Sequence, residues 1–427
     1  MSGVAAAPAS RLSEWWRRVR DPAIWMPTAD TFAVLTAASL PWSTSLVGIF
    51  ALLWLGSAAL IVDYPEYFRS LKQPICALPL AIFGLALLGT LWSDAPWATR
   101  LYSVAPYAKF LLLPGLFHHF ARSSRGMWVF VAFLVSTTMM MVMSWITAFE
   151  PAFTLKPVGD RLCGVFAKNY IDQSQEFSLC VVALTYPVMV LLKEGKRWQA
   201  GLLIAIALGL VLNMVFVIAS RTAQVTIPLL LALFALRYLS WRSTIVLGVI
   251  TLIGASLWAV TPRMCRTVET LARDLTLYEQ QNIPTSAGLR LEYWKKSTQF
   301  IQQAPFAGHG TGSIQGLFQR AATGYAVEAT GHVVANPHNQ TLHTAIQWGI
   351  MGVILLYLMW VSHLLLFRGE GLVAWIGMLV VLQNMLSSLF NSHLVDFHAG
   401  WMYVLGVGVA GGMMLKRRAG FPAKRAV

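Results

Sequence analysis

Long uncharged apolar stretches recur along the whole chain, and they limit the fold more than any other feature. A helix needs roughly 20 apolar residues to cross a bilayer, and stretches of that kind alternate here with short charged segments. Of the 427 residues, 57% are hydrophobic and only 12% are charged, which is too little polar material to cover a water-soluble globule. The sequence therefore predicts an all-α, polytopic membrane protein built as a helical bundle.

The hydropathy pattern predicts about twelve transmembrane helices. They are expected near residues 28–43, 44–63, 73–93, 97–119, 126–148, 174–192, 198–220, 222–240, 242–261, 339–367, 371–392 and 397–415. Pro41 interrupts the first span, and only a short turn separates that span from the second. A short helical hairpin is therefore the alternative interpretation of this region.

Positive charge indicates the orientation of the bundle, because loops rich in Lys and Arg resist translocation. One set of alternate connections carries Arg11, Arg17, Arg18, Arg20, Arg69, Lys72, Arg122, Arg125, Lys193, Lys196, Arg197, Arg237, Arg242, Lys416, Arg417 and Arg418. Both termini are therefore expected in the cytoplasm. The net charge of +14 largely reflects this bias, so membrane lipids and not nucleic acid are the expected surroundings.

The pattern divides the chain into four parts. Residues 1–261 are expected to form nine transmembrane helices with short loops, and residues 262–338 one long loop on the non-cytoplasmic side. Residues 339–415 then form three more transmembrane helices, and residues 416–427 a basic cytoplasmic tail. The long loop is expected to contain a helix at 290–302 and a glycine-rich turn at 308–312.

Arginines on the non-cytoplasmic side contradict the orientation rule and are candidates for function. Arg161, Arg221 and Arg290 lie on this side, and Arg221 and Arg290 are the strongest candidates, because the planar guanidinium suits phosphate and several together would neutralise a pyrophosphate. Pairing with a lipid headgroup or a loop carboxylate is the better interpretation for the other arginines of this side, namely Arg263, Arg266, Arg273 and Arg320.

His338 is the candidate catalytic residue, because histidine can accept and return a proton near neutral pH. Pro337 precedes it at the point where the long loop enters a helix, which constrains its orientation. For a lone histidine, helix capping or interface packing is the competing interpretation. No clustered Cys and His spacing appears, so we expect no metal site and no cofactor.

Five motifs in this order resemble those of the O-antigen ligase and polymerase family of Gram-negative envelopes. They are Gly159 to Phe166, Ser220-Arg221-Thr222-Ala223, Gly288-Leu289-Arg290 with the following Trp294, the turn Gly308 to Gly312, and Pro337-His338-Asn339 followed by Gly349 to Gly352. The resemblance covers roughly Arg161 to Asp396, and Asp396 is similar to a late acidic residue of the family.

This resemblance implies a glycosyltransferase of the GT-C type in the bacterial inner membrane, with its active site on the periplasmic face. Its donor would be O-antigen linked to undecaprenyl pyrophosphate, and a ligase would use lipid A core oligosaccharide as acceptor. His338 would be the general base in a metal-independent, inverting transfer. Arg161, Arg221 and Arg290 would bind substrate phosphates, Asn336 and Asn339 would line the same site, and Asp396 would orient His338.

Two other functions stay open at this point. An O-antigen polymerase or a protein O-oligosaccharyltransferase would use the same donor, so the acceptor distinguishes them from a ligase. A flippase or transporter of lipid-linked glycans is the non-enzymatic alternative. A transporter is expected to carry polar groups along several spans, whereas most charges here, apart from Lys109, cluster at one face.

Overall fold

The structure, a computed structural model, describes residues 20–156, 162, 164–218, 221–259 and 262–420. All regular elements in these residues are helices, which confirms the predicted all-α class. The elements are α2 (Pro22–Ser39), α3 (Thr44–Ile61), α4 (Tyr64–Ser70), α5 (Pro74–Leu88), α6 (Trp97–Val104), η1 (Ala105–Leu111), α7 (Leu112–Phe120), α8 (Gly126–Phe149), α9 (Tyr170–Ala183), α10 (Thr185–Lys193), α11 (Arg197–Phe216), α12 (Arg221–Tyr238), α13 (Trp241–Ala259), α14 (Pro262–Gln281), α15 (Ser286–Gln303), α16 (Ile314–Arg320), α17 (Gln340–Leu366), α18 (Leu372–Ser387) and α19 (Phe397–Gly420).

Several of these helices are long and apolar enough to cross a membrane, so this is a multi-pass membrane protein. Among the described residues six helical stretches qualify: Thr44–Ile61, Gly126–Phe149, Tyr170–Lys193, Arg197–Phe216, Gln340–Leu366 and Phe397–Gly420. The pair α4 and α5, bent by 79°, makes a seventh if it counts as one span. The helices Ala223–Tyr238 and Leu372–Ser387 are apolar but shorter.

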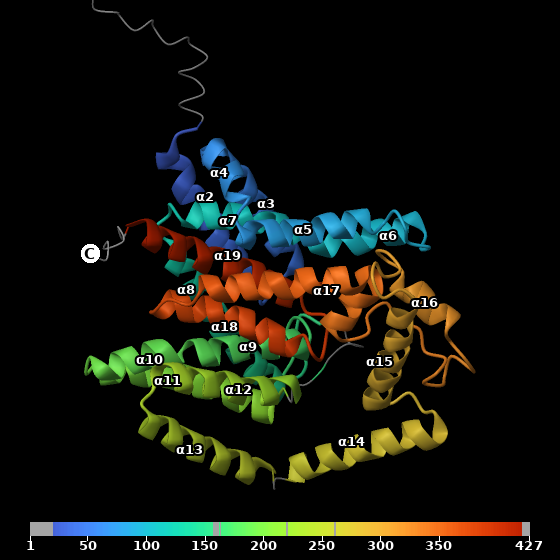
Figure 1. The fold of residues 1–427 in the computed structure, drawn as a ribbon. Coiled ribbons are helices and arrows are strands. Elements are labelled where there is room, and N and C mark those ends of the chain that lie inside the picture. The colour runs from blue at the N-terminus through green and yellow to red at the C-terminus, as the bar shows by residue number, and fades with distance from the viewer. Residues whose placement is uncertain (1–19, 157–161, 163, 219–220, 260–261, 421–427) are drawn as a thin grey trace, which may run out of the picture.

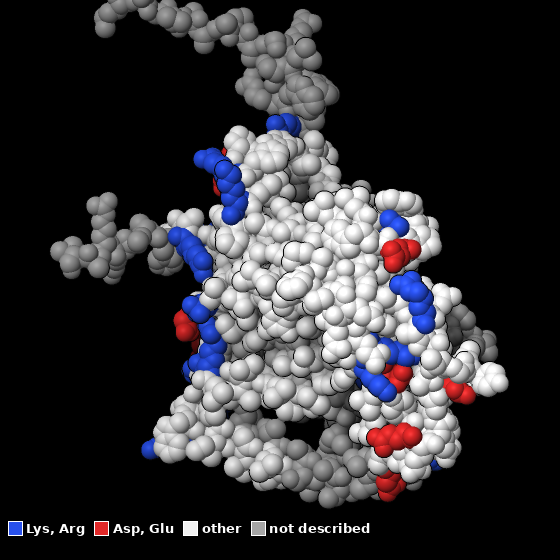
Figure 2. Space-filling view, turned by 45° about the vertical axis from the view of Figure 1, so that its right-hand side comes forward, with Lys and Arg blue, Asp and Glu red and all other residues white. Residues whose placement is uncertain are grey.

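Most of the apolar helices run in one general direction, and the two ends of the bundle differ (Figure 1). One end, which we call the terminal face, carries the start of α2 and the end of α19. The other, the loop face, carries α15, α16 and the start of α17 (Figure 1). Figure 2 shows Lys and Arg along the edge near the chain ends, further charges at the opposite edge, and an uncharged belt between them. Such a belt is what a lipid-facing surface requires.

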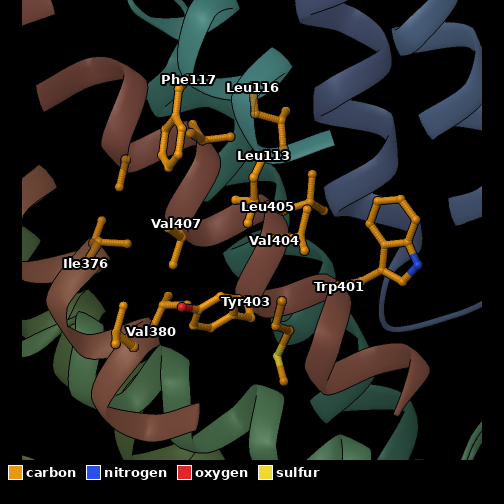
Figure 3. Packing of buried hydrophobic residues seen from close by; sticks show 14 of the residues in the cluster. Leu113, Leu116, Phe117, Ile376, Val380, Trp401, Tyr403, Val404, Leu405 and Val407 are labelled. Carbon is orange, nitrogen blue, oxygen red and sulfur yellow. The ribbon is translucent and has the colours of Figure 1, made fainter. Parts of the chain in front are cut away.

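Helix α19 lies in the middle of the core, against α7 and α18 (Figure 3). Small residues let its neighbours approach closely. A methyl group at Gly408 would collide with Leu116, and one at Gly411 would collide with Phe117. Close packing of this kind holds helices together where no water is present to drive their association. Residues at the loop-face end of α19 are therefore fixed relative to the rest of the bundle.

The span expected at 97–119 is not one regular α-helix. The structure has α6, then the 3₁₀ segment η1, then α7 over this stretch. Pro106 lies at the start of η1 and cannot donate an N–H to the preceding turn, which accounts for the change of helix type there. The buried Lys109 lies within η1.

Helix α17 is interrupted at Gly349, whose φ of 58° and ψ of −152° are not helical. The interruption frees backbone groups, and the glycine-rich turn of the long loop binds them. His309 N donates to Ile346 O at 2.8 Å, and Gly310 N donates to Gln347 O at 2.8 Å. In return, Ile350 N donates to Pro305 O at 2.9 Å. The loop is thereby attached to the helix that follows His338.

We predict that Gly349→Ala destabilises the protein. A methyl group there would collide with the backbone of Phe306, and the positive φ disfavours any side chain. The expected loss is on the order of 2 kcal/mol or more, measured by SDS-induced unfolding in mixed micelles.

Gly56→Ala in α3 is the matched control, since an added methyl group meets nothing within 4 Å there. It should leave stability unchanged or slightly raised. Equal stability of the two variants would show that the turn and the broken helix are not held as described.

Candidate functional site

His338 stands at the loop face in an unusual backbone conformation. Its φ is 55°, one of two positive values among the described non-glycine residues. The conformation is held by its own N–H, which donates to Asn336 Oδ1 at 2.9 Å, and by Trp294 Nε1, which donates to Pro337 O at 3.2 Å. The imidazole stacks on the ring of Tyr293, with 6.2 Å between centroids and 27° between planes. Strained backbone held by several contacts is typical of functional sites.

The hydrogen bonds of Asn391 determine which nitrogen of His338 carries the proton. Asn391 Nδ2 donates to Asp396 Oδ2 at 2.7 Å, because a carboxylate can only accept. Asn391 Oδ1 therefore faces His338 Nδ1, 2.9 Å away, and must accept from it. The proton of the neutral imidazole is then on Nδ1, and Nε2 keeps its lone pair. No other described residue binds Nε2, so this lone pair is available to a substrate.

Asp396 lies at the end of this chain of hydrogen bonds and not in contact with His338. Its carboxylate also accepts from His393 Nδ1 at 3.2 Å. Its backbone carbonyl accepts from Lys109 Nζ at 2.7 Å. Three polar side chains thus hold Asp396, and the buried lysine of η1 has a partner that accounts for its position.

Arg290 lies on α15, near enough for its charge to act on His338. Burial lowers the pKa of His338 below its ordinary value, and the positive charge of Arg290 lowers it further. The hydrogen bond to Asn391 and the charge of Asp396 act in the opposite direction. Arg290 makes no ion pair with any carboxylate of the described residues. Its guanidinium can therefore bind an anionic substrate beside His338.

The other residues expected in the site divide into two groups. Asn336 and Asn339 lie beside His338, and both hold the backbone: Asn339 Oδ1 accepts from Leu342 N at 3.1 Å and caps α17. Arg221 is the first residue of α12, but its side chain is not described. Arg161 lies outside the described residues.

A second group of buried charges joins α9 to α19 next to this site. His398 Nδ1 lies 2.6 Å from Asp172 Oδ2, and Lys168 Nζ lies 3.5 Å from Glu176 Oε1. All four side chains are at most 10% exposed. Buried pairs of this kind are geometrically demanding. They therefore fix the segment before α9 relative to the start of α19.

The sequence did not indicate Asn391 or Tyr293 as parts of the site. A signal for Asn391 exists, since Asn391-Ser392-His393 is a polar run between two apolar helices. For Tyr293, its place three residues after Arg290 on one helix is the only clue.

No group of three or more His, Cys, Asp or Glu side chains that could hold a metal ion occurs within the residues that the structure describes. Whether the transfer depends on a metal ion is a separate question, and a metal-independent transfer stays a prediction.

A comparison with known protein families places these features in context. Residues 205–357 match the family model described as O-antigen ligase. This part of the chain is similar to the O-antigen ligase family. The matched part contains Arg221, Arg290 and His338, whereas Asn391 and Asp396 follow it. No curated protein matches the chain.

We predict that His338 titrates below the ordinary histidine value of about 6.5, because burial and Arg290 disfavour its charged form. Carbethoxylation requires the neutral ring, so its rate at the peptide containing His338 should fall only as pH drops below that value. Mass spectrometry of the modified peptide gives the midpoint.

In the Arg290→Gln variant the midpoint should move to higher pH. Arg320→Gln should not move it, since that exposed arginine faces Asp94 at 4.0 Å. A midpoint at or above 6.5 in the unmodified protein would contradict the electrostatics described here.

Proposed function

We propose that this protein is a membrane glycosyltransferase that ligates O-antigen polysaccharide, carried on undecaprenyl pyrophosphate, to a sugar hydroxyl of lipid A core oligosaccharide. The observation that carries this proposal is a histidine whose Nε2 binds no other described residue, beside an arginine without a carboxylate partner among the described residues, both within the part of the chain that matches the O-antigen ligase family model. We place the loop face in the periplasm of a bacterial inner membrane. Twelve crossings and the GT-C class belong to the same proposal.

Arg290 would bind the pyrophosphate of the donor, together with Arg221 and Arg161. Pyrophosphate leaves readily when its charge is neutralised, so no acid is needed to protonate it. The guanidinium of Arg290 has no carboxylate partner among the described residues and loses no ion pair when it turns to a substrate.

His338 would accept the proton of the acceptor hydroxyl at Nε2. The acceptor oxygen forms a bond to the anomeric carbon while the bond from that carbon to the pyrophosphate oxygen breaks. One direct displacement inverts the anomeric centre. The proton on Nε2 then passes to solvent, which restores the base.

Asp396 would orient His338 through Asn391. Asn336 and Asn339 would shape the site mainly through the backbone at His338 and the first turn of α17. The reaction needs no cofactor in this proposal, and its partners are the two lipid-linked glycans.

The decisive experiment is ligation by the purified full-length protein with lipid-linked O-antigen and lipid A core, in buffer containing EDTA. The wild type should join polymer to lipid A core. His338→Gln should lower the rate at least about 100-fold, the usual contribution of a general base. Gel mobility of the product measures both.

Other products would separate the alternatives. Longer polymer on the lipid carrier would favour a polymerase, and glycan on a protein acceptor an oligosaccharyltransferase. Movement of intact donor across vesicle membranes without transfer would favour a flippase. Activity that requires added magnesium or manganese would contradict the metal-independent mechanism.

We further predict that Arg290→Lys lowers kcat/KM about 10- to 100-fold, because lysine keeps the charge but loses the two-pronged hydrogen bond. Arg320→Lys, which is matched in chemistry and lies on the same face, should retain near-normal activity. If both lysine variants have the same kcat/KM, Arg290 does not clamp the pyrophosphate.

A further inference from the structure

A cavity lies on the terminal face, at the opposite end of the bundle from His338. It lies between α3, α4 and the η1–α7 segment and has a volume of about 180 Å³. Most of its wall is apolar, including Leu55, Ile61 and Leu112, and its polar side chains include Tyr67 and Arg122.

Three of the side chains that line the cavity each carry a buried polar atom without a hydrogen-bond partner among the described residues. The atoms are Trp54 Nε1, His118 Nε2 and His119 Nδ1. The three side chains are 2%, 7% and 3% exposed. Buried polar atoms are almost always satisfied, so three such atoms around one cavity indicate a ligand that supplies partners.

The ligand must supply acceptors and can also supply a donor. The indole N–H of Trp54 can only donate. His119 Nε2 lies 2.8 Å from Asp30 Oδ1 and donates to it, since a carboxylate only accepts, so Nδ1 of the neutral ring keeps its lone pair and can accept from a ligand hydroxyl. Arg122 uses Nη2 for Glu66 and Nη1 for the carbonyl of His118, which leaves further N–H groups of its guanidinium free.

The surroundings are those of a membrane interface with positive charge. Arg20 lies over the ring of Tyr64, 5.5 Å from its centroid, and donates to the carbonyls that end α3. Lys416 donates to the carbonyls of Arg122 and Ser123. Tyrosines and basic side chains together are typical of helix ends at a lipid headgroup layer, and such clusters attract anionic lipids.

We propose that this cavity binds an anionic phospholipid of the leaflet at the terminal face. One acyl chain lies between α3 and α7, and the phosphate and ester oxygens accept from Arg122, His118 and Trp54. The apolar wall excludes a small polar metabolite, and the donors with the net positive rim select an anion over a neutral amphiphile. The site does not depend on the function proposed above.

The test uses the full-length protein in detergent, with phosphatidylglycerol or phosphatidylcholine added in increasing amounts. Phosphatidylglycerol should raise the thermal unfolding midpoint saturably, by about 5 °C at about 100 times its dissociation constant. Phosphatidylcholine should raise it much less. An equal rise with both lipids would overturn the anionic specificity and leave a cavity that takes any acyl chain.

Two variants and their controls locate the effect. Arg122→Gln should abolish most of the response to phosphatidylglycerol, whereas Arg125→Gln, an exposed arginine three residues away, should keep it. Ala59→Phe fills the cavity and should also abolish the response, whereas Leu52→Phe on the exposed side of α3 should not. If Arg122→Gln does not fold, Ala59→Phe decides alone. A full response in Ala59→Phe would place the lipid elsewhere and overturn the proposal.

Discussion

Backbone carbonyls left free among apolar helices are costly, and the break in α17 at Gly349 creates such carbonyls at Ile346 and Gln347. The glycine-rich turn of the long loop supplies the missing donors. Thr311 of the same turn donates to the carbonyl of Ala86 at 2.7 Å, which fastens α5 as well. The loop that carries Arg290 is therefore anchored to the helix that begins just after His338, and the position of the candidate site depends on this exchange of hydrogen bonds.

The residues around His338 control its charge by opposing effects. Burial and Arg290 favour the neutral ring, whereas Asn391 and Asp396 favour the charged one. A histidine that acts as a general base must be neutral before the reaction, and its protonated form must be accessible during it. In the proposed reaction, the negative charge of a donor pyrophosphate bound to Arg290 would offset the arginine and make proton uptake by His338 easier. Substrate binding would thereby raise the pKa of His338 at the stage of the reaction when it accepts a proton.

The sequence predicts the parts of this protein that depend on local pattern. The helical class, the helix at α15 and the family of residues 205–357 all follow from hydropathy or motif. It predicts less well what depends on distant contacts. Asp396 was expected to orient His338, but the prediction did not include Asn391, which lies 53 residues after His338 in the chain and connects the two side chains. The 3₁₀ segment around Lys109 was missed because hydropathy does not report helix type.

An amide between His338 and Asp396 has a physical advantage over direct contact. A carboxylate touching the imidazole would raise its pKa and add a full negative charge next to the site where the proposed donor pyrophosphate would bind. Asn391 carries no net charge: its Nδ2 is fixed by Asp396, and its Oδ1 then fixes the tautomer of His338. The negative charge stays one side chain further away, where His393 also binds it. The arrangement suits a base that works beside an anionic donor, because it directs the lone pair of Nε2 without repelling the substrate.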